Sequence, residues 1–474
     1  MLAALTLALN GCTQNAEAAV TTAAQTAEAS GTAAAQDETV SSATETTAEY
    51  RETYPSSEDN SHAITADGET AAYDQILVQK TGDGEGDEAD FYGTNAAVYA
   101  ENGGQLTITD SRIETSGSHA NAVFSYGEGS VINISDSVIE TSKNNSGGIM
   151  VTGGGTLNAE NLNVTTQGGS SAAIRSDRGG GTLNVTGGTY QSYGSGSPAI
   201  YSTADITVSN AELYSDISQA VVVEGKNSVT LNNTNAVGKN TKKNSDKSDY
   251  FQAVMIYQSM SGDAAEGKGR FTINGGSLTS LNGGMFFVNN TVAEINLDKV
   301  ELNYASDDLL RICAAGWGNQ GSNGGQVTFT GKDQDLKGVV TVDEISSLNL
   351  ILNGDSSFEG SIDNTGEVYV ELNNQSVWKL TANSSVSSLT CSADAIDLNG
   401  FTLTVGGTEY VEGTASEGTA IEVKAAQRTG GHGSTPPEGM GNPPEGMGNP
   451  PEKPEHHGKP EMNGQHGMPE KSML

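Results

Sequence analysis

The stretch from residue 155 to residue 190, GTLNAENLNVTTQGGSSAAIRSDRGGGTLNVTGGTY, decides the fold of this chain. The triplet Leu157-Asn-Ala159 returns 26 residues later as Leu183-Asn-Val185, and in both triplets two apolar residues flank a polar one. Alternation with a period of two is typical of a β-strand that buries one face. The stretch therefore contains one repeat of a β structure and the start of the next.

Triplets with the same pattern recur through the middle of the chain. Twelve of them occur between residues 106 and 391, most of them 20–26 residues apart, and all but one carry Thr or Asn in the middle. A second apolar position follows most triplets, and then a third short run such as Ala173-Ile-Arg175. Three short strands per repeat, separated by Gly, Asn, Ser and Asp turns, are typical of one coil of a parallel β-helix.

The repeat predicts an all-β fold, a single-stranded right-handed parallel β-helix (solenoid) of about twelve coils over residues 76–425. One coil cannot bury its own apolar face, so stacking of coils at ~4.8 Å builds one narrow core. A β-sandwich is the alternative, but its strands would not repeat in register at this spacing.

The composition of the 474 residues agrees with this fold and disfavours other classes. The chain has 60 glycines, which suit turns, and 5% aromatic residues, which suit a narrow core. Its net charge of −36, from 23 basic and 59 acidic residues, argues against a nucleic-acid partner. No apolar run approaches the ~18–20 residues of a membrane span. We expect one repetitive domain with two tails, and a monomer.

The N-terminal residues predict export and anchoring. Residues 1–11 are typical of the end of a signal peptide, and because basic residues are missing we expect the true start to lie upstream. The stretch Leu9-Asn-Gly-Cys12 resembles the lipobox of bacterial lipoproteins. The resemblance implies that Cys12 becomes lipidated and anchors the protein to the bacterial membrane or cell surface, outside the cytoplasm. The alternative is an ordinary secretory signal with an incidental Cys.

Both tails have compositions that predict disorder. Residues 12–75 are an acidic segment rich in Ala, Thr and Ser, which we interpret as a tether. Residues 426–474 are rich in Pro, Gly, Met and His and contain a seven-residue unit twice, at 437–443 and 444–450. The acids of 83–88 have some EF-hand spacing, but the sixth and twelfth positions lack Gly and Glu, which favours a solvated loop over a Ca²⁺ site. No cofactor is expected.

The region 76–425 resembles the pectin-lyase-like β-helix superfamily, and residues 378–405 resemble the final coils of autotransporter-passenger and adhesin-like proteins. The resemblance implies the fold more than the function, because this fold carries lyases, hydrolases, tailspikes and adhesins. Within 76–425 the only His is His119, and the Arg-Ile-Lys motif of polygalacturonase-like hydrolases is missing. Whether the protein is an enzyme stays open, although the missing motifs argue against it. Cys313 and Cys391 lie too many coils apart for a disulfide.

Three insertions point to a site, since loops on rigid scaffolds carry function. They are 238–250, which holds four lysines, 258–269, and 314–325, which holds Trp317. We expect a lateral groove that binds a glycan, and the candidate ligand-binding residues are Arg175, Asp177, Arg178, Tyr201, Tyr257 and Trp317. The alternatives are that Trp317 folds back over the β-helix and that Arg175, Asp177 and Arg178 form a salt-bridged corner.

These observations predict an adhesin-like surface protein that binds a polysaccharide, or a glycan or protein of a host or cell surface, through its lateral face and loops. One alternative is a polysaccharide lyase or glycoside hydrolase acting on acidic glycans. Another is a purely structural surface spacer.

Overall fold

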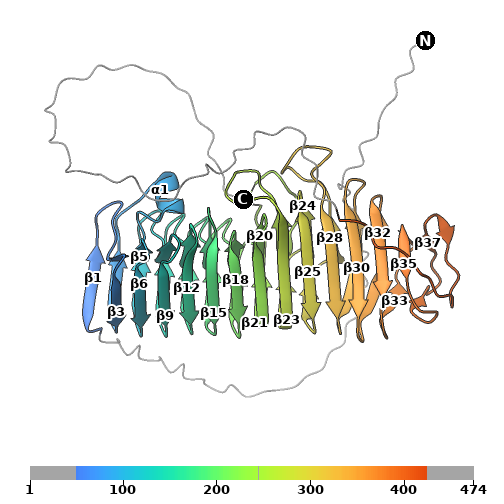
Figure 1. The fold of residues 1–474 in the computed structure, drawn as a ribbon, viewed down its shortest axis with the longest axis horizontal. Coiled ribbons are helices and arrows are strands. Elements are labelled where there is room, and N and C mark those ends of the chain that lie inside the picture. The colour runs from blue at the N-terminus through green and yellow to red at the C-terminus, as the bar shows by residue number, and fades with distance from the viewer. Residues whose placement is uncertain (1–49, 244, 424–474) are drawn as a thin grey trace, which may run out of the picture. The chain divides into compact units, whose positions relative to one another are not determined.

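The structure is a computed structural model that describes residues 50–243 and 245–423, and the described residues from Arg51 onward belong to one compact unit. This unit is a parallel β-helix whose coils stack in chain order (Figure 1). The lipobox with Cys12, the expected signal segment 1–11 and the expected tail 426–474 lie outside the described residues.

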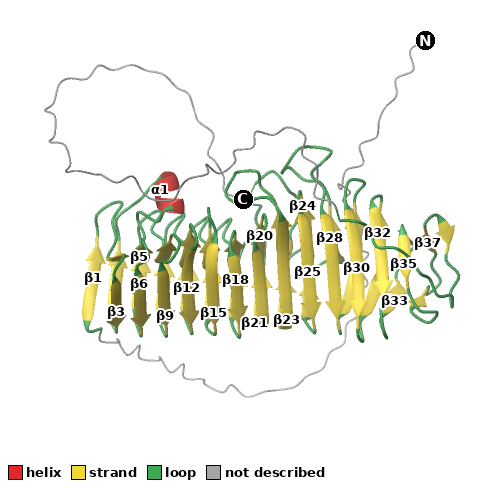
Figure 2. Cartoon of the chain, in the orientation of Figure 1, coloured by secondary structure: helices red, strands yellow, loops and turns green. Residues whose placement is uncertain are grey.

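Each coil places strands in two parallel sheets, one of 21 strands and one of 14 strands (Figure 2). The first row of the larger sheet consists of β3 (Thr70–Asp74), β6 (Gln105–Thr109), β9 (Val131–Ser135), β12 (Gly155–Glu160), β15 (Gly181–Thr186), β18 (Asp205–Ser209), β21 (Ser228–Gly238), β23 (Lys268–Ser280), β25 (Val292–Asp298), β28 (Gln326–Lys332), β30 (Ser347–Asn353), β32 (Glu367–Leu372) and β35 (Ser388–Thr390). Its second row consists of β1 (Glu52–Ser56), β4 (Ile76–Lys80), β7 (Arg112–Thr115), β10 (Val138–Thr141), β13 (Asn163–Thr166), β16 (Thr189–Ser192), β19 (Glu212–Ser215) and β26 (Glu301–Tyr304). The long strands β21 and β23 run through both rows.

The smaller sheet takes one strand from each coil. Its members are β2 (Ile64–Asp67), β5 (Val98–Glu101), β8 (Val123–Tyr126), β11 (Ile149–Thr152), β14 (Ile174–Ser176), β17 (Ile200–Ser202), β20 (Val221–Glu224), β22 (Gln252–Tyr257), β24 (Gly284–Asn289), β27 (Asp308–Ile312), β29 (Asp335–Val342), β31 (Ser357–Asn364), β33 (Val377–Leu380) and β36 (Ile396–Asp397). The remaining elements are the helix α1 (Gly86–Phe91) and a small sheet of β34 (Ser384–Val386), β37 (Leu403–Val405) and β38 (Thr408–Glu409).

The register of the strands confirms the repeat read from the sequence. Leu157 pairs with Leu183, and Asn158 pairs with Asn184 in the same step. Eleven of the twelve predicted triplets fall within consecutive strands of the first row, from β6 to β32, and the last begins in β35 and ends one residue after it, at Cys391. Their apolar residues face one continuous core, because residues of one parity in a strand point to the same side of the sheet.

The β-helix begins earlier than the sequence predicts. The strands β1, β2 and β3 lie within residues 12–75, the segment interpreted as a disordered tether. In β2, Ile64 and Ala66 are buried while Thr65 and Asp67 are exposed, and the strand pairs with β5. The composition of 12–75 as a whole hides these short strands, which the next coil stabilises by stacking. The domain boundary therefore lies near residue 51 and not near residue 76.

The expected acidic loop also has regular structure. Residues 86–91 form α1, and Asp87 in its first turn pairs with Arg178. The Asp83 carboxylate accepts a hydrogen bond from the backbone N–H of Ser118 at 2.7 Å. These acids therefore tie the segment to neighbouring coils.

Candidate functional site

From β5 to β24 the outer face of the smaller sheet is covered, although its side chains point away from the core. Toward the two ends of the sheet, outward residues such as Thr65, Asp363 and Lys379 are exposed. In each strand one outward residue pairs with the outward residue of the next strand, so that these residues form a column along the sheet. Their neighbours in each strand point into the core. All of the following members are buried: Tyr99, Phe124, Met150, Arg175, Tyr201, Val222, Met255 and Phe287. At one end, Ala96 packs with Tyr99, Phe124 and Met150 in a hydrophobic cluster of its own.

Arg175 and Asp177 form an ion pair within this covered face. The Arg175 guanidinium Nη2 donates to Asp177 Oδ2 at 3.0 Å, and the two side chains are only 3% and 1% exposed. Burial raises the pKa of Asp177 to about 7, although Arg175 opposes that shift. The second oxygen, Asp177 Oδ1, is buried with no hydrogen-bond partner among the described residues. The open groove expected at Arg175 is therefore a closed, charged layer.

Tyr201, Glu224 and Tyr257 continue the same layer. Tyr201 lies beside Arg175 on the neighbouring strand, and its hydroxyl donates to Glu224 Oε2 at 2.5 Å. Glu224 Oε1 accepts from the backbone N–H of Ser259 at 3.1 Å, which holds the start of the second insertion. Burial raises the pKa of Glu224, and it raises the pKa values of both tyrosines well above their usual value. Tyr201, Glu224 and Tyr257 therefore help to hold the second insertion, residues 258–269, against the smaller sheet.

Arg178 lies at the border of the layer and links two covering segments. Its Nε contacts Asp263 at 2.8 Å, its Nη1 contacts Asp87 at 3.2 Å, and its guanidinium carbon lies 3.7 Å from the centre of the Phe91 ring. The side chain is 37% exposed. Arg178 therefore connects α1 to the insertion at 258–269.

Trp317 folds back over the β-helix. The residue is 5% exposed, and its ring packs edge-on against Tyr257, with ring centres 5.2 Å apart. The Lys247 ammonium lies 5.8 Å from the centre of the Trp317 ring, and the Gly316 N–H donates to the Lys247 carbonyl at 2.7 Å. The first and third insertions therefore meet at Trp317. The structure brings Arg175, Tyr201, Tyr257 and Trp317 along one strip, but buried and not as the wall of an open groove.

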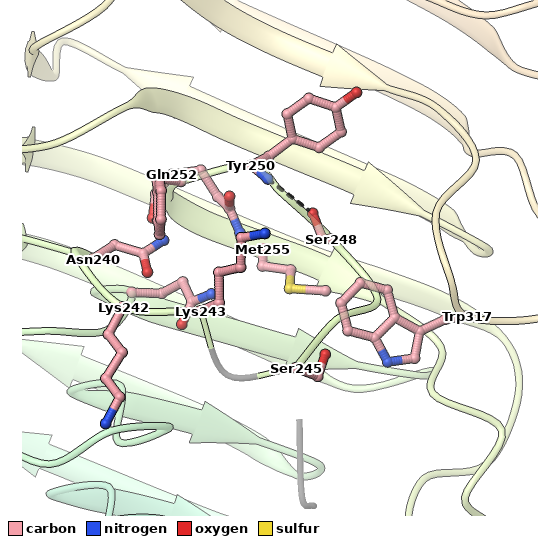
Figure 3. Close-up of a pocket in the computed structure, with 11 residues that line it drawn as sticks. Asn240, Lys242, Lys243, Ser245, Ser248, Tyr250, Gln252, Met255 and Trp317 are labelled. Atoms are coloured by element: carbon pink, nitrogen blue, oxygen red, sulfur yellow. Dashed lines mark hydrogen bonds between the residues drawn. The ribbon is translucent and has the colours of Figure 1, made fainter. Parts of the chain in front are cut away.

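An open hollow lies where the first insertion and Trp317 meet, with about 360 Å³ of empty space that includes the solvent at its mouth (Figure 3). Polar, basic and aromatic side chains line it: Gln219, Asn240, Lys242, Lys243, Ser245, Ser248, Tyr250, Phe251, Gln252, Met255 and Trp317. Of the six candidate ligand-binding residues, Trp317 lines it. The other five lie elsewhere in the covered layer or at its border.

The hollow contains a buried acceptor and exposed cations. Gln252 is 3% exposed, and its side-chain oxygen Oε1 has no hydrogen-bond partner among residues 50–243 and 245–423. Lys242 and Lys243 are exposed, and in Figure 3 the Lys243 side chain extends toward Met255 whereas that of Lys242 points away. Lys243 forms an ion pair with Asp249. The sequence shows the basic insertion, but only the fold shows that it adjoins Trp317.

Other groups with catalytic or binding potential have structural partners. His119 Nδ1 lies 2.7 Å from Asp90 Oδ1, and its Nε2 lies 3.0 Å from the Asn145 amide. Cys313 and Cys391 are buried free thiols. In the described part of the chain, no group of three or more His, Cys, Asp or Glu side chains is arranged to hold a metal ion. The described helices include none long and apolar enough to span a membrane.

No family model, no curated protein and no solved structure matches this chain.

Proposed function

We propose that this chain is an adhesin-like surface protein that binds glycans through the hollow between the first insertion and Trp317. The observation that carries the proposal is the contrast between this hollow and the covered part of the outer face beside it. The column from Tyr99 to Val222 is buried, while at Met255 aromatic, amide and ammonium groups surround open space. Concave sites with a few fixed polar groups are the usual form of a ligand site.

The test fills the hollow without removing a contact of the core. Ser245 is half-buried and lines the hollow, so Ser245→Trp places a large ring in the space. The matched control is Ser142→Trp, an exposed serine in the turn between β10 and β11. We expect the wild type and Ser142→Trp to bind the same glycans on an array, and Ser245→Trp to lose them. Binding to no glycan by the wild type, or unchanged binding by Ser245→Trp, would contradict the proposal.

Binding is favoured over catalysis by the burial of Asp177 and Glu224, the two carboxyl groups that lie beside Arg175, Tyr201 and Tyr257. Asp177 and Glu224 are fully buried beneath the covering segments, where a polysaccharide does not reach them. Incubation with acidic polysaccharides, with and without Ca²⁺, separates the two functions. New reducing ends, or an unsaturated product that absorbs ultraviolet light, would instead support a lyase or hydrolase.

We further propose that the protein is exported and held on the bacterial surface by a lipid on Cys12. The support is the lipobox-like stretch Leu9-Asn-Gly-Cys12. Expression of the chain behind a complete signal peptide, followed by membrane fractionation and mass spectrometry, tests it. We expect a lipid-modified Cys12 in the membrane fraction and release of Cys12→Ser; the same fractionation for both chains would contradict the anchor.

A further inference from the structure

The ligand class of the hollow follows from its local charge. The first insertion, residues 238–250, carries Lys239, Lys242, Lys243 and Lys247 against two acids, Asp246 and Asp249, in a chain whose net charge is −36. Lys239 is already paired with Asp216 at 3.1 Å, and Lys243 with Asp249. Lys242 and Lys247 form no ion pair with any described residue. The insertion is thus a basic island on an acidic protein, in which Lys243 lines the hollow and Lys247 lies beside Trp317 next to it.

A ligand carboxylate in the hollow would meet Lys243, a lysine that already binds a carboxylate. Lys243 lies on the wall of the hollow, and its present partner, Asp249, is an exposed carboxylate of the same loop. An exposed ion pair of this kind contributes little stability, so exchange of Asp249 for a ligand anion costs little. The Asp249 contact shows that the Lys243 ammonium pairs with a carboxylate at the border of the hollow.

The remaining groups suit a sugar ring. The unpartnered Gln252 Oε1 is an acceptor, so it calls for a donor such as a sugar hydroxyl. Trp317 and Tyr250 supply aromatic surface at the same hollow. Arg311 covers the Tyr250 ring at 4.4 Å and is itself paired with Asp308 at 2.6 Å, which fixes that side of the site.

We propose that the hollow binds an anionic saccharide, with the sugar carboxylate or sulfate held by Lys243 and a ring hydroxyl donating to Gln252. Lys247 does not line the hollow but lies beside Trp317, where its charge adds to the attraction. The proposal rests on the glycan-binding function proposed above and names its ligand class. The net charge of the protein does not prevent this, since at physiological salt the field of charges more than ~8 Å away is largely screened.

The experiment is calorimetric titration of the full chain with matched saccharides. The probes are trigalacturonic acid, its methyl ester, which keeps the rings and removes the charge, and a sulfated oligosaccharide of the same length. We expect the acid or the sulfated sugar to bind and the ester to bind at least about tenfold more weakly, since the charge-assisted contact to Lys243 and the attraction of Lys247 are lost. Raising the salt concentration should weaken only the charged probes.

Lysine substitutions distinguish binding at the first insertion from a general electrostatic attraction of the saccharide to the protein. Lys243→Gln and Lys247→Gln should each weaken the charged probe by about fivefold, the value of one exposed charge pair. Lys143→Gln is the matched control, an exposed lysine with no described ion-pair partner in the turn after β10, and it should leave binding unchanged. Asp249→Asn frees Lys243 and should tighten binding, a gain that a misfolded variant could not show.

The outcomes distinguish this inference from the function on which it rests. Equal binding of the acid and its ester, or unchanged binding by both lysine variants, overturns the anionic ligand while glycan binding stands. Neutral array glycans that bind when all charged probes fail also overturn it. A chain that binds no saccharide of either kind overturns both proposals.

Discussion

Trp317 packs edge-on against Tyr257, with ring centres 5.2 Å apart and planes at 69°, although sixty residues separate them in the sequence. Tyr257 ends β22 and Trp317 lies in the third insertion, so the contact closes the outer face of the smaller sheet beside the hollow. In the sequence, Trp317 lies in a Gly-rich loop and is expected to be an exposed aromatic ring. This contact instead makes Trp317 part of the layer that covers the smaller sheet. This relationship leads to the first prediction.

Trp317→Ala should destabilise the domain, because it removes a buried ring from its contact with Tyr257. Large aromatic truncations in cores cost about 3–5 kcal/mol, and we expect a value near the lower end because a loop relaxes more easily than a core. Urea denaturation measures the free energy of unfolding. The control is Phe401→Ala, whose residue is 37% exposed and which should change stability much less. A similar small loss for both variants would show that Trp317 is not a structural cover.

Asp177 should make stability fall as the pH rises from about 4 to about 7. Burial raises the pKa of folded Asp177 to about 7, whereas in the unfolded chain it is about 3.9. Between these values the folded state holds a proton that the unfolded state has lost, so ν_U − ν_N is negative and the free energy of unfolding decreases with pH. The contribution of this one group is at most about 1.4 kcal/mol per pH unit.

Asp177→Asn tests that sign. The variant removes the partner of Arg175 and is expected to change stability at every pH. The informative quantity is therefore how the free energy of unfolding changes with pH, and not its value at any one pH. The stability of the wild type relative to Asp177→Asn should decrease between about pH 4 and pH 7 in urea denaturation. Parallel pH profiles for the two chains would mean that Asp177 does not titrate in this range.

Arg178→Gln should loosen the two segments that Arg178 connects. It loses the contacts to Asp263 and Asp87 and the position over Phe91. Hydrogen exchange should become faster in α1 and in residues 258–267, with little change elsewhere. Arg112→Gln is the control, since Arg112 pairs with Glu114 and Glu140 on the larger sheet. Equal exchange in α1 for both variants would contradict the connecting role.

A chain that begins at residue 76 should be less stable than one that begins at residue 50. The shorter chain lacks β1, β2 and β3, whose pairing with β4, β5 and β6 covers the first full coil. Loss of these strands exposes Val98, Leu106 and their neighbours in the core. Thermal unfolding should show a lower midpoint for the chain starting at 76, whereas equal midpoints would place the functional boundary of the domain at residue 76.

The core of the fold is predictable from local pattern, while its edges are not. Each of the twelve triplets alternates with a period of two, and such alternation specifies one buried face whatever its neighbours are. The segment with Ile64 and Ala66 carries the same alternation, but too briefly to stand out against an Ala- and Thr-rich background. Its strand forms because the next coil supplies hydrogen-bond partners, and partners from another coil are not visible in local composition.

The sequence by itself determined the coil, its three strands, the inward and outward parity of each residue and the basic character of the first insertion. Successive side chains of a strand point to opposite faces because of backbone geometry alone. The alternation around Arg175 is therefore enough to place this residue on the outer face. Only the tertiary structure decided that this face is buried, because the cover comes from α1 and from insertions that lie far away along the chain. The same long-range contacts turned Trp317 inward, and left the one open hollow we describe beside the lysines of residues 238–250.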